Sequence, residues 1–139
     1  MFKRWLIPFA AGVLCFACRD ATGDQVVIGT IDAGGTLKDV IASPASGSAG
    51  QRLSFTVSTF GNSCVAAAGA QVVVRDLQAT VTPLDRESRT GTCLDYLKAY
   101  PRSVTVTFDR AGDATIRVEG RSFYQSGLVT VEHHVTIEP

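Results

Sequence analysis

The sequence predicts an all-β domain, an antiparallel sandwich or barrel of about seven to eight short strands. Three observations support this prediction. Apolar and polar side chains alternate in several segments, turn residues recur roughly every 8–12 positions, and helix signals are confined to two short stretches. Hydrophobic residues make up 45% and charged residues 19% of the 139 positions, which suits one domain with a buried core.

Period-two alternation is clearest in three segments, 53–58, 104–109 and 114–119. Neighbouring side chains of a strand point to opposite faces, so each segment is predicted to be a strand with one buried face. The other β-rich runs are 25–31, 37–43, 72–77, 79–84 and 128–137. Turn or loop chemistry separates these runs at 32–35, 44–50, 61–62, 85–91, 111–113 and 120–127.

Two short segments favour helical turns. Cys64–Gly69 is rich in alanine and follows Asn62 or Ser63 as a cap, and Leu94–Tyr100 has apolar residues at helical spacing before Pro101. Each segment adjoins a cysteine. We therefore expect one or two helical turns, pinned together by a disulfide at one end of the domain.

The first residues form a separate segment. Lys3 and Arg4 precede an unbroken apolar and small-residue run of 13 positions, 5–17, which Arg19 and Asp20 end. A charged start followed by such a run is typical of an export signal. A stable transmembrane helix needs about 20 apolar residues, so this run is too short to serve as one. We expect 1–17 to be a signal peptide.

The end of that run, Leu14-Cys15-Phe16-Ala17-Cys18, resembles the lipobox of bacterial lipoproteins. The family places a small residue before an acylated cysteine, and Ala17 before Cys18 fits. The segment departs from the family pattern at one position. The family usually has Leu three residues before the acylated cysteine, whereas this sequence has Cys15 there. The resemblance implies lipidation at Cys18, a lipidated tether over 18–24, and a membrane-anchored protein of the bacterial cell envelope, facing the periplasm or the surface.

Two other interpretations of the start remain open. Ala21-Thr22-Gly23 is a tolerable site for ordinary signal cleavage after Gly23, and the apolar run could stay as an uncleaved N-terminal anchor. All three interpretations place the domain outside the cytoplasm.

The cysteine count supports export. Of four cysteines, Cys15 and Cys18 belong to the signal region, which leaves Cys64 and Cys93. In an oxidising compartment this pair is predicted to form a disulfide, worth roughly 3–4 kcal/mol by chain entropy. Two buried free thiols are the alternative. A metal site is disfavoured because neither cysteine has a second Cys or a His at ligand spacing.

The part from Asp39 to Glu138 resembles bacterial immunoglobulin-like domains. Ala49-Gly50-Gln51-Arg52-Leu53-Ser54-Phe55 fits the step into their second strand, and Phe108…Gly112-Asp-Ala-Thr-Ile-Arg-Val118 fits their hairpin before a last strand at 128–137. The chain departs in having no Trp after Trp5 and in placing its cysteine pair in loop-like segments. The resemblance implies an immunoglobulin-like β-sandwich over 25–139 and no functional residue.

Charge limits the partners. The whole chain has 13 basic and 13 acidic residues, and cleavage at Cys18 removes Lys3 and Arg4, which leaves 11 − 13 = −2. A mildly acidic domain has no basic excess for nucleic acid, so we expect no nucleic-acid partner. The N-terminal lipid would then supply the membrane attachment.

No set of residues predicts catalysis, and we expect a protein that is not an enzyme and has no cofactor or metal. His133 and His134 are neighbours in a predicted strand, so they point to opposite faces and cannot chelate one ion together. No serine lies on a nucleophile elbow that a Ser-His-Asp triad would need. The acidic residues in or near loops are interpreted as solvated charge, because they lack a calcium-loop pattern: Asp32, Asp39, Asp85 and Glu87.

Phe123 and Tyr124 are the candidate recognition residues, in the loop between the last two strands. Exposed aromatic rings there would form a contact patch, and the alternative is that one ring caps the core. Tyr96 and Tyr100, with Leu94 and Leu97, are the next candidates for recognition, but the role we expect for them is packing under the disulfide.

The sequence therefore favours a lipid-anchored, non-enzymatic binding or structural module that contacts a protein or glycan through its loops. The alternative is a periplasmic small-ligand or metal-binding protein that uses loop carboxylates with His133 or His134.

Overall fold

The computed structural model describes residues 23–139, so the predicted signal peptide 1–17, the lipidation site Cys18 and most of the tether 18–24 lie outside the described residues. The described part is all-β, as predicted, with two sheets and no helix. The strands are β1 (Gln25–Ile28), β2 (Thr30–Ile31), β3 (Ile41–Ala42), β4 (Ser46–Ser48), β5 (Arg52–Gly61), β6 (Val65–Arg75), β7 (Gln78–Glu87), β8 (Lys98–Thr107), β9 (Gly112–Ser122) and β10 (Leu128–Glu138).

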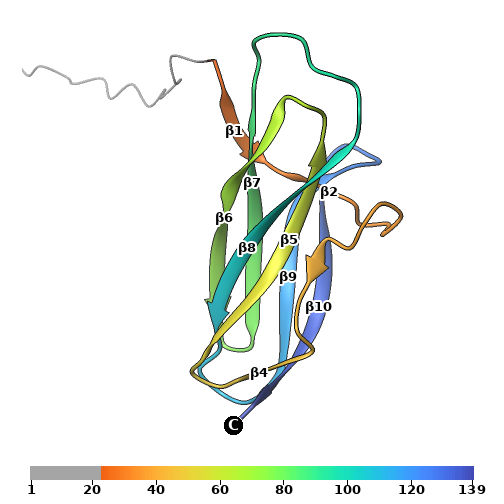
Figure 1. The fold of residues 1–139 in the computed structure, drawn as a ribbon. Helices are drawn as coiled ribbons and strands as arrows, with labels where there is room; N and C mark the ends of the chain where they lie inside the picture. The colour runs from red at the N-terminus through yellow and green to blue at the C-terminus, as the bar shows by residue number, and fades with distance from the viewer. Residues whose placement is uncertain (1–22) are drawn as a thin grey trace, which may run out of the picture.

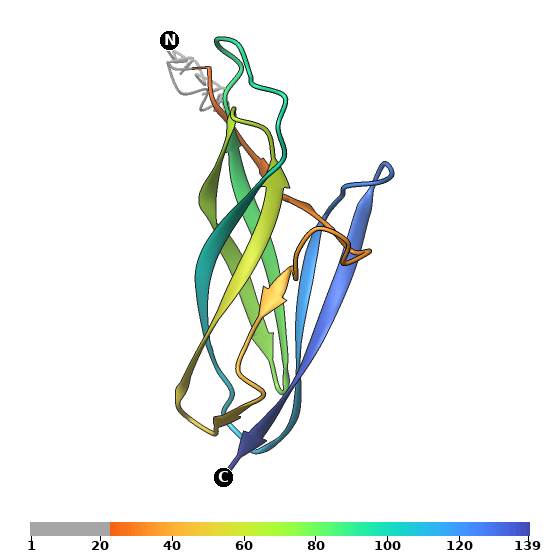
Figure 2. The same cartoon turned by 45° about the vertical axis from the view of Figure 1, so that its right-hand side comes forward.

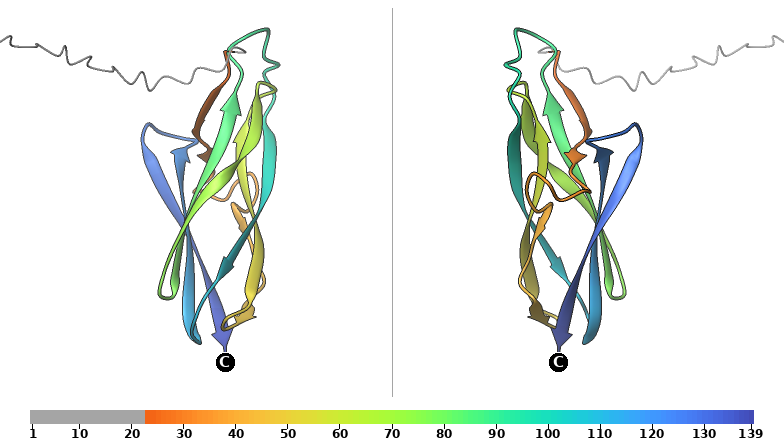
Figure 3. Two further views of the ribbon diagram at one scale, coloured as in Figure 1. Left: turned by 90° about the vertical axis from the view of Figure 1, so that its left-hand side faces the viewer. Right: turned by 90° about the vertical axis from the view of Figure 1, so that its right-hand side faces the viewer.

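The strands form two layers, which Figure 3 shows edge-on. One sheet has seven strands, with the path β1-β7-β9-β10-β4, β6 paired to β7, and β2 paired to β9. The other has the order β3-β5-β8. The pairings β7–β9, β2–β9 and β4–β10 are parallel, so the larger sheet is mixed rather than antiparallel throughout.

The core lies between the layers. Every second side chain is buried in the first half of β5 (52–57), in 102–106 of β8 and along β9, as the alternation predicts, whereas 58–60 at the end of β5 are all buried. Val57 of β5 meets a layer of fully buried residues from the larger sheet that includes Val81, Ile116 and Val118. Phe108, just after β8, is the largest fully buried side chain.

The first apolar run is split by Gly29. The Gly29 amide donates to Pro83 O on β7 (2.8 Å), and its carbonyl accepts from Arg121 N on β9 (2.9 Å), so β1 and β2 bridge these strands where they separate. A Cβ at Gly29 would lie 2.4 Å from Thr59 Cγ2 and 2.8 Å from Asp85 Oδ2. Only glycine therefore fits this position without a shift of its neighbours.

The predicted helical turns are wrong. The alanine-rich segment 65–69 belongs to β6, which pairs with β7 along most of its length, and 98–100 belongs to β8, where Tyr100 pairs with Thr59. A single helical turn is marginal by itself, so strand pairing over about ten residues overrides local preference. Residues 94–97 form an irregular loop. The described residues form ten strands instead of about eight, because the predicted run 25–31 divides into β1 and β2 and a short strand forms at 46–48 inside a predicted loop.

The predicted disulfide is present. Cys64 and Cys93, 29 residues apart in sequence, join the start of β6 to the loop 88–97. This loop and the start of β1 lie at one end of the molecule, and the C-terminus lies at the other (Figure 1). The disulfide therefore fixes the loop at the end where the described chain begins.

Candidate functional site

The candidate site is a set of loops at and beside the disulfide end. The loops 32–40, 88–97 and 123–127 extend from the body there, with the β9–β10 hairpin standing apart from the loop 88–97 (Figure 2). Loops on a rigid scaffold are where recognition residues concentrate.

The hairpin tip carries both predicted recognition residues. Phe123 and Tyr124 are 40% and 58% exposed, and their rings meet edge to face with centroids 5.2 Å apart. The Phe123 amide donates to Ile31 O (3.1 Å), and the Tyr124 hydroxyl hydrogen-bonds Thr36. Neither ring is buried as a cap on the core. The pair is instead an exposed aromatic surface held in place by the loop 32–40.

Asp32 organises that supporting loop. Its carboxylate accepts hydrogen bonds from the amides of Gly34 (3.0 Å) and Leu37 (2.7 Å) and from the hydroxyl of Thr36 (3.3 Å). Burial by itself raises the pKa of Asp32, but these bonds and the Tyr124 hydroxyl outweigh it, and the pKa is lowered from 3.8. The side chain is 1% exposed, so its interpretation as solvated loop charge is wrong.

Asp85 is likewise not a solvated loop charge. It lies within β7 and is 1% exposed, and it accepts hydrogen bonds from Arg102 (2.6 Å) and Thr59 (2.9 Å) between the sheets. Glu87 is half-buried and forms an ion pair with Arg121. Asp39 alone of the four acids is exposed in its loop.

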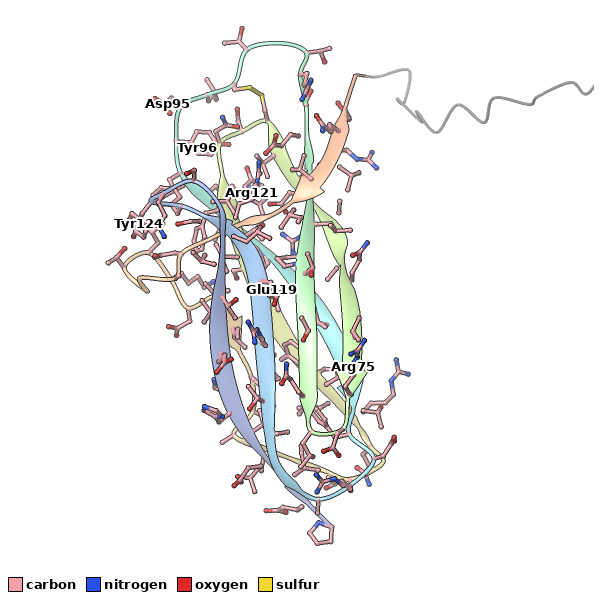
Figure 4. The ribbon with its side chains drawn as sticks, turned by 180° about the vertical axis from the view of Figure 1, so that it is seen from behind. Arg75, Asp95, Tyr96, Glu119, Arg121 and Tyr124 are labelled. Carbon is pink, nitrogen blue, oxygen red and sulfur yellow. A yellow bond between two sulfur atoms is a disulfide. The ribbon has the colours of Figure 1, made fainter. Side chains whose placement is uncertain are left out.

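Two hollows adjoin each other behind the hairpin and share Thr30 and Arg121. One, of about 370 Å³, is lined by the hairpin residues 125–128, and the other, of about 290 Å³, reaches the disulfide. Figure 4 shows Arg121 at the same end of the domain as Tyr124 of the hairpin and Tyr96 of the loop 88–97. Because Glu87 already neutralises Arg121, these hollows offer hydrogen-bonding groups rather than a free charge.

The histidines lie on opposite faces of β10, as their adjacency predicts. His134 is exposed and contacts Thr115 through Nδ1 (3.3 Å), whereas His133 lines a third hollow, of about 310 Å³, with Asp32 and Asp39. Within residues 23–139, no group of three or more His, Cys, Asp or Glu is placed to hold a metal ion. The same residues include no helix long and apolar enough to cross a membrane.

The loop 88–97 differs from expectation. Leu94, Tyr96 and Leu97 are 61%, 46% and 47% exposed, so they do not pack under the disulfide. Tyr100 is more covered, donates to Asn62 O, and has Lys98 Nζ 5.6 Å from its ring centroid. Burial beside Tyr96 and Asp85 raises the pKa of Tyr100.

Sequence reasoning named these residues only as secondary recognition candidates and expected them to be packed. The apolar residues at helical spacing in 94–100 favour a helical turn beside Cys93, and this expectation hid the exposed loop. The available signal was the composition of 88–92, which has no large apolar residue to continue a buried element.

Compared with known protein families, curated proteins and solved structures, the chain shows no significant match to any of them.

Proposed function

We propose that this protein is a lipid-anchored protein of the bacterial cell envelope whose domain is a non-enzymatic binding or structural module. The lipobox ending at Cys18 supports the anchor. The Cys64–Cys93 disulfide supports a location outside the reducing cytoplasm, because such bonds persist in oxidising compartments.

The proposed domain class is the immunoglobulin-like sandwich. Its connections pass between facing sheets, and here the chain changes sheet from β5 to β6, from β7 to β8, and from β8 to β9. Such crossings place loops together at the two ends of a sandwich. The parallel pairing of β7 with β9 is a departure from antiparallel sheets of that class.

The exposed aromatic pair carries the binding part of the proposal. Phe123 and Tyr124 present two rings to solvent, and hydrogen bonds from the Phe123 amide to Ile31 O and between the Tyr124 and Thr36 hydroxyls hold their loop. Aromatic anchors that are already ordered contribute contact area with little loss of conformational entropy. We propose that they contact a protein or glycan of the envelope by surface complementarity.

Site-specific photocrosslinking tests the recognition surface. A photoreactive phenylalanine at Tyr124 should give a discrete adduct in intact cells, and the adduct should disappear when Phe123 is changed to Ser. Val73 is the matched control, since it is 52% exposed on β6, away from the hairpin. The same adducts from both positions, or none from Tyr124, would refute the proposed surface.

Metabolic labelling with radioactive palmitate tests the anchor. Cys18→Ala should abolish incorporation, and Cys15→Ala should retain it, because only Cys18 follows a small residue as the lipobox requires. Persistent labelling of Cys18→Ala would contradict the anchor. Metal bound at unit stoichiometry in native mass spectrometry would favour the metal-binding alternative instead.

A further inference from the structure

The loop 88–97 holds large apolar side chains in solvent. Leu94, Tyr96 and Leu97 are all exposed within four consecutive residues. The loop is fixed at its base, because the disulfide anchors Cys93 and the Leu94 amide donates to Ser63 Oγ (2.6 Å). A fixed loop that exposes apolar side chains is typical of a contact surface.

The chain enters the domain beside this loop. A Cβ at Gly23 would lie 3.4 Å from Thr90 Cγ2, and Arg89 donates to the side chain of Gln25 at the start of β1. The start of β1 and the loop are at the same end of the molecule in Figures 1 and 2.

The length of chain before Gly23 limits where the membrane can be. Gly23 is five residues after Cys18, and even a fully extended chain spans at most about 3.6 Å per residue, or about 18 Å in total. The domain is longer than this tether. Its longest strands, such as β9, have 11 residues, and at about 3.3 Å per residue such a strand is roughly 36 Å long. An acylated Cys18 therefore keeps the loop 88–97 nearer to the bilayer than the opposite end.

We propose that the segment Leu94–Leu97 rests in the interfacial layer of the same bilayer that holds acylated Cys18, an inference that depends on the lipid anchor proposed above. Tyr is enriched at the membrane interface, and leucine side chains gain by leaving water there. The loop 88–97 has one cation, Arg89, and one anion, Asp95, so it has no net charge.

This second contact would fix the orientation of the domain. With the lipid and the loop both at the bilayer, the C-terminal end points away from the membrane. In Figure 2 the tip of the β9–β10 hairpin stands to the side of the loop 88–97 and extends less far toward that end, so in this orientation it stays free for a partner.

Depth-sensitive fluorescence on the full lipidated protein tests the proposal. The protein carrying Leu94→Cys is labelled without reductant with an environment-sensitive dye, then reconstituted into vesicles of phosphatidylethanolamine and phosphatidylglycerol. Arg75→Cys is the matched control, because it lies at the opposite end of the domain (Figure 4). We expect a blue shift and several-fold stronger quenching by lipid-attached quenchers at position 94 than at position 75.

Two results would overturn the proposal. Equal, weak quenching at both positions would mean that the loop does not reach the bilayer. A blue shift at position 94 without lipid quenching would assign the loop to a second protein copy. A repeat with the dye at Tyr96→Cys guards against an effect peculiar to one substitution.

Palmitate labelling of the same variants separates this inference from the anchor. If label is incorporated and position 94 is not quenched, the loop contact alone is wrong. If no label is incorporated, the lipid anchor itself is wrong.

Discussion

Arg102 of β8 and Asp85 of β7 form a buried ion pair between the two sheets, with Nη2 2.6 Å from Oδ1 and side chains 6% and 1% exposed. Arg102 also donates to the carbonyls of Gly69 (3.1 Å) and Leu84 and to the hydroxyl of Thr59. The pair therefore links both layers at a polar position inside an apolar core. Breaking it leaves a charge without a partner.

Loss of the Arg102 side chain should destabilise the fold strongly. Arg102→Met leaves the Asp85 carboxylate buried and unpaired, which typically costs about 3–5 kcal/mol. The double variant with Asp85→Leu should recover part of that loss, because both charges are then absent. Urea denaturation measures the difference.

Arg110→Ala is the matched control for that series. Arg110 pairs with Asp76 at 2.6 Å, but these side chains are 61% and 65% exposed, so solvent screens the pair and its loss should cost far less stability than loss of Arg102. Similar losses in both variants would contradict the assigned role of the buried pair.

Gly29→Ala should also destabilise the protein. The added methyl would overlap Thr59 Cγ2 and Asp85 Oδ2, and overpacking of a core typically costs about 1–3 kcal/mol. Gly47→Ala is the comparison, since its nearest neighbours are the ends of Leu53 and Ile137 at 3.3 and 3.5 Å, which can yield. A thermal midpoint that falls no further for Gly29→Ala than for Gly47→Ala would refute this packing.

Removal of the disulfide should lower the free energy of unfolding by roughly 3–4 kcal/mol, given a 29-residue separation. The variant Cys64→Ser with Cys93→Ser measures this in urea. The loop 88–97 should also become more sensitive to protease, because its base is released. Unchanged stability and unchanged cleavage would mean that the bond does not constrain this end.

Acid stability should depend on Asp32. Its folded-state pKa is below the ordinary 3.8, so the carboxylate stabilises the fold above that pH, and the contribution is lost as the pH falls through the folded-state pKa. Asp32→Asn should therefore be less stable than wild type near neutrality and show a shallower decline in acid. Unfolding across acidic pH measures both slopes.

Asp39→Asn is the control for that series, since Asp39 is an exposed carboxyl of the same loop. If the stability of Asp39→Asn depends on pH in the same way as that of Asp32→Asn, the hydrogen bonds to Asp32 do not cause the loss of stability in acid.

The strands with one buried face could be predicted from sequence. Alternation located 53–58, 104–109 and 114–119 because one side of each segment is covered by the opposite sheet. It failed at β6, where Val72–Val74 are all exposed and no alternation marks the strand. There the pairing with β7 determines the structure, and the local sequence pattern does not reveal it.

Whether a charged residue is buried or solvated could not be predicted from the sequence. Asp32 and Asp85 lie at polar positions in sequence, and nothing local distinguishes a solvated carboxylate from one enclosed by amides or by an arginine from another strand. The partner of Asp85 is 17 residues away, and the Thr36–Tyr124 contact spans 88 residues. The aromatic pair at Phe123 and Tyr124 could be located because a loop between two alternating strands marks it.

Intact-mass and N-terminal mass spectrometry of the protein from the membrane fraction tests the central claim most directly. We expect a chain that begins at Cys18, with a mass increased by a diacylglyceryl group. A chain that begins at Asp24 without a lipid, or one that retains Met1–Ala17, would contradict the account.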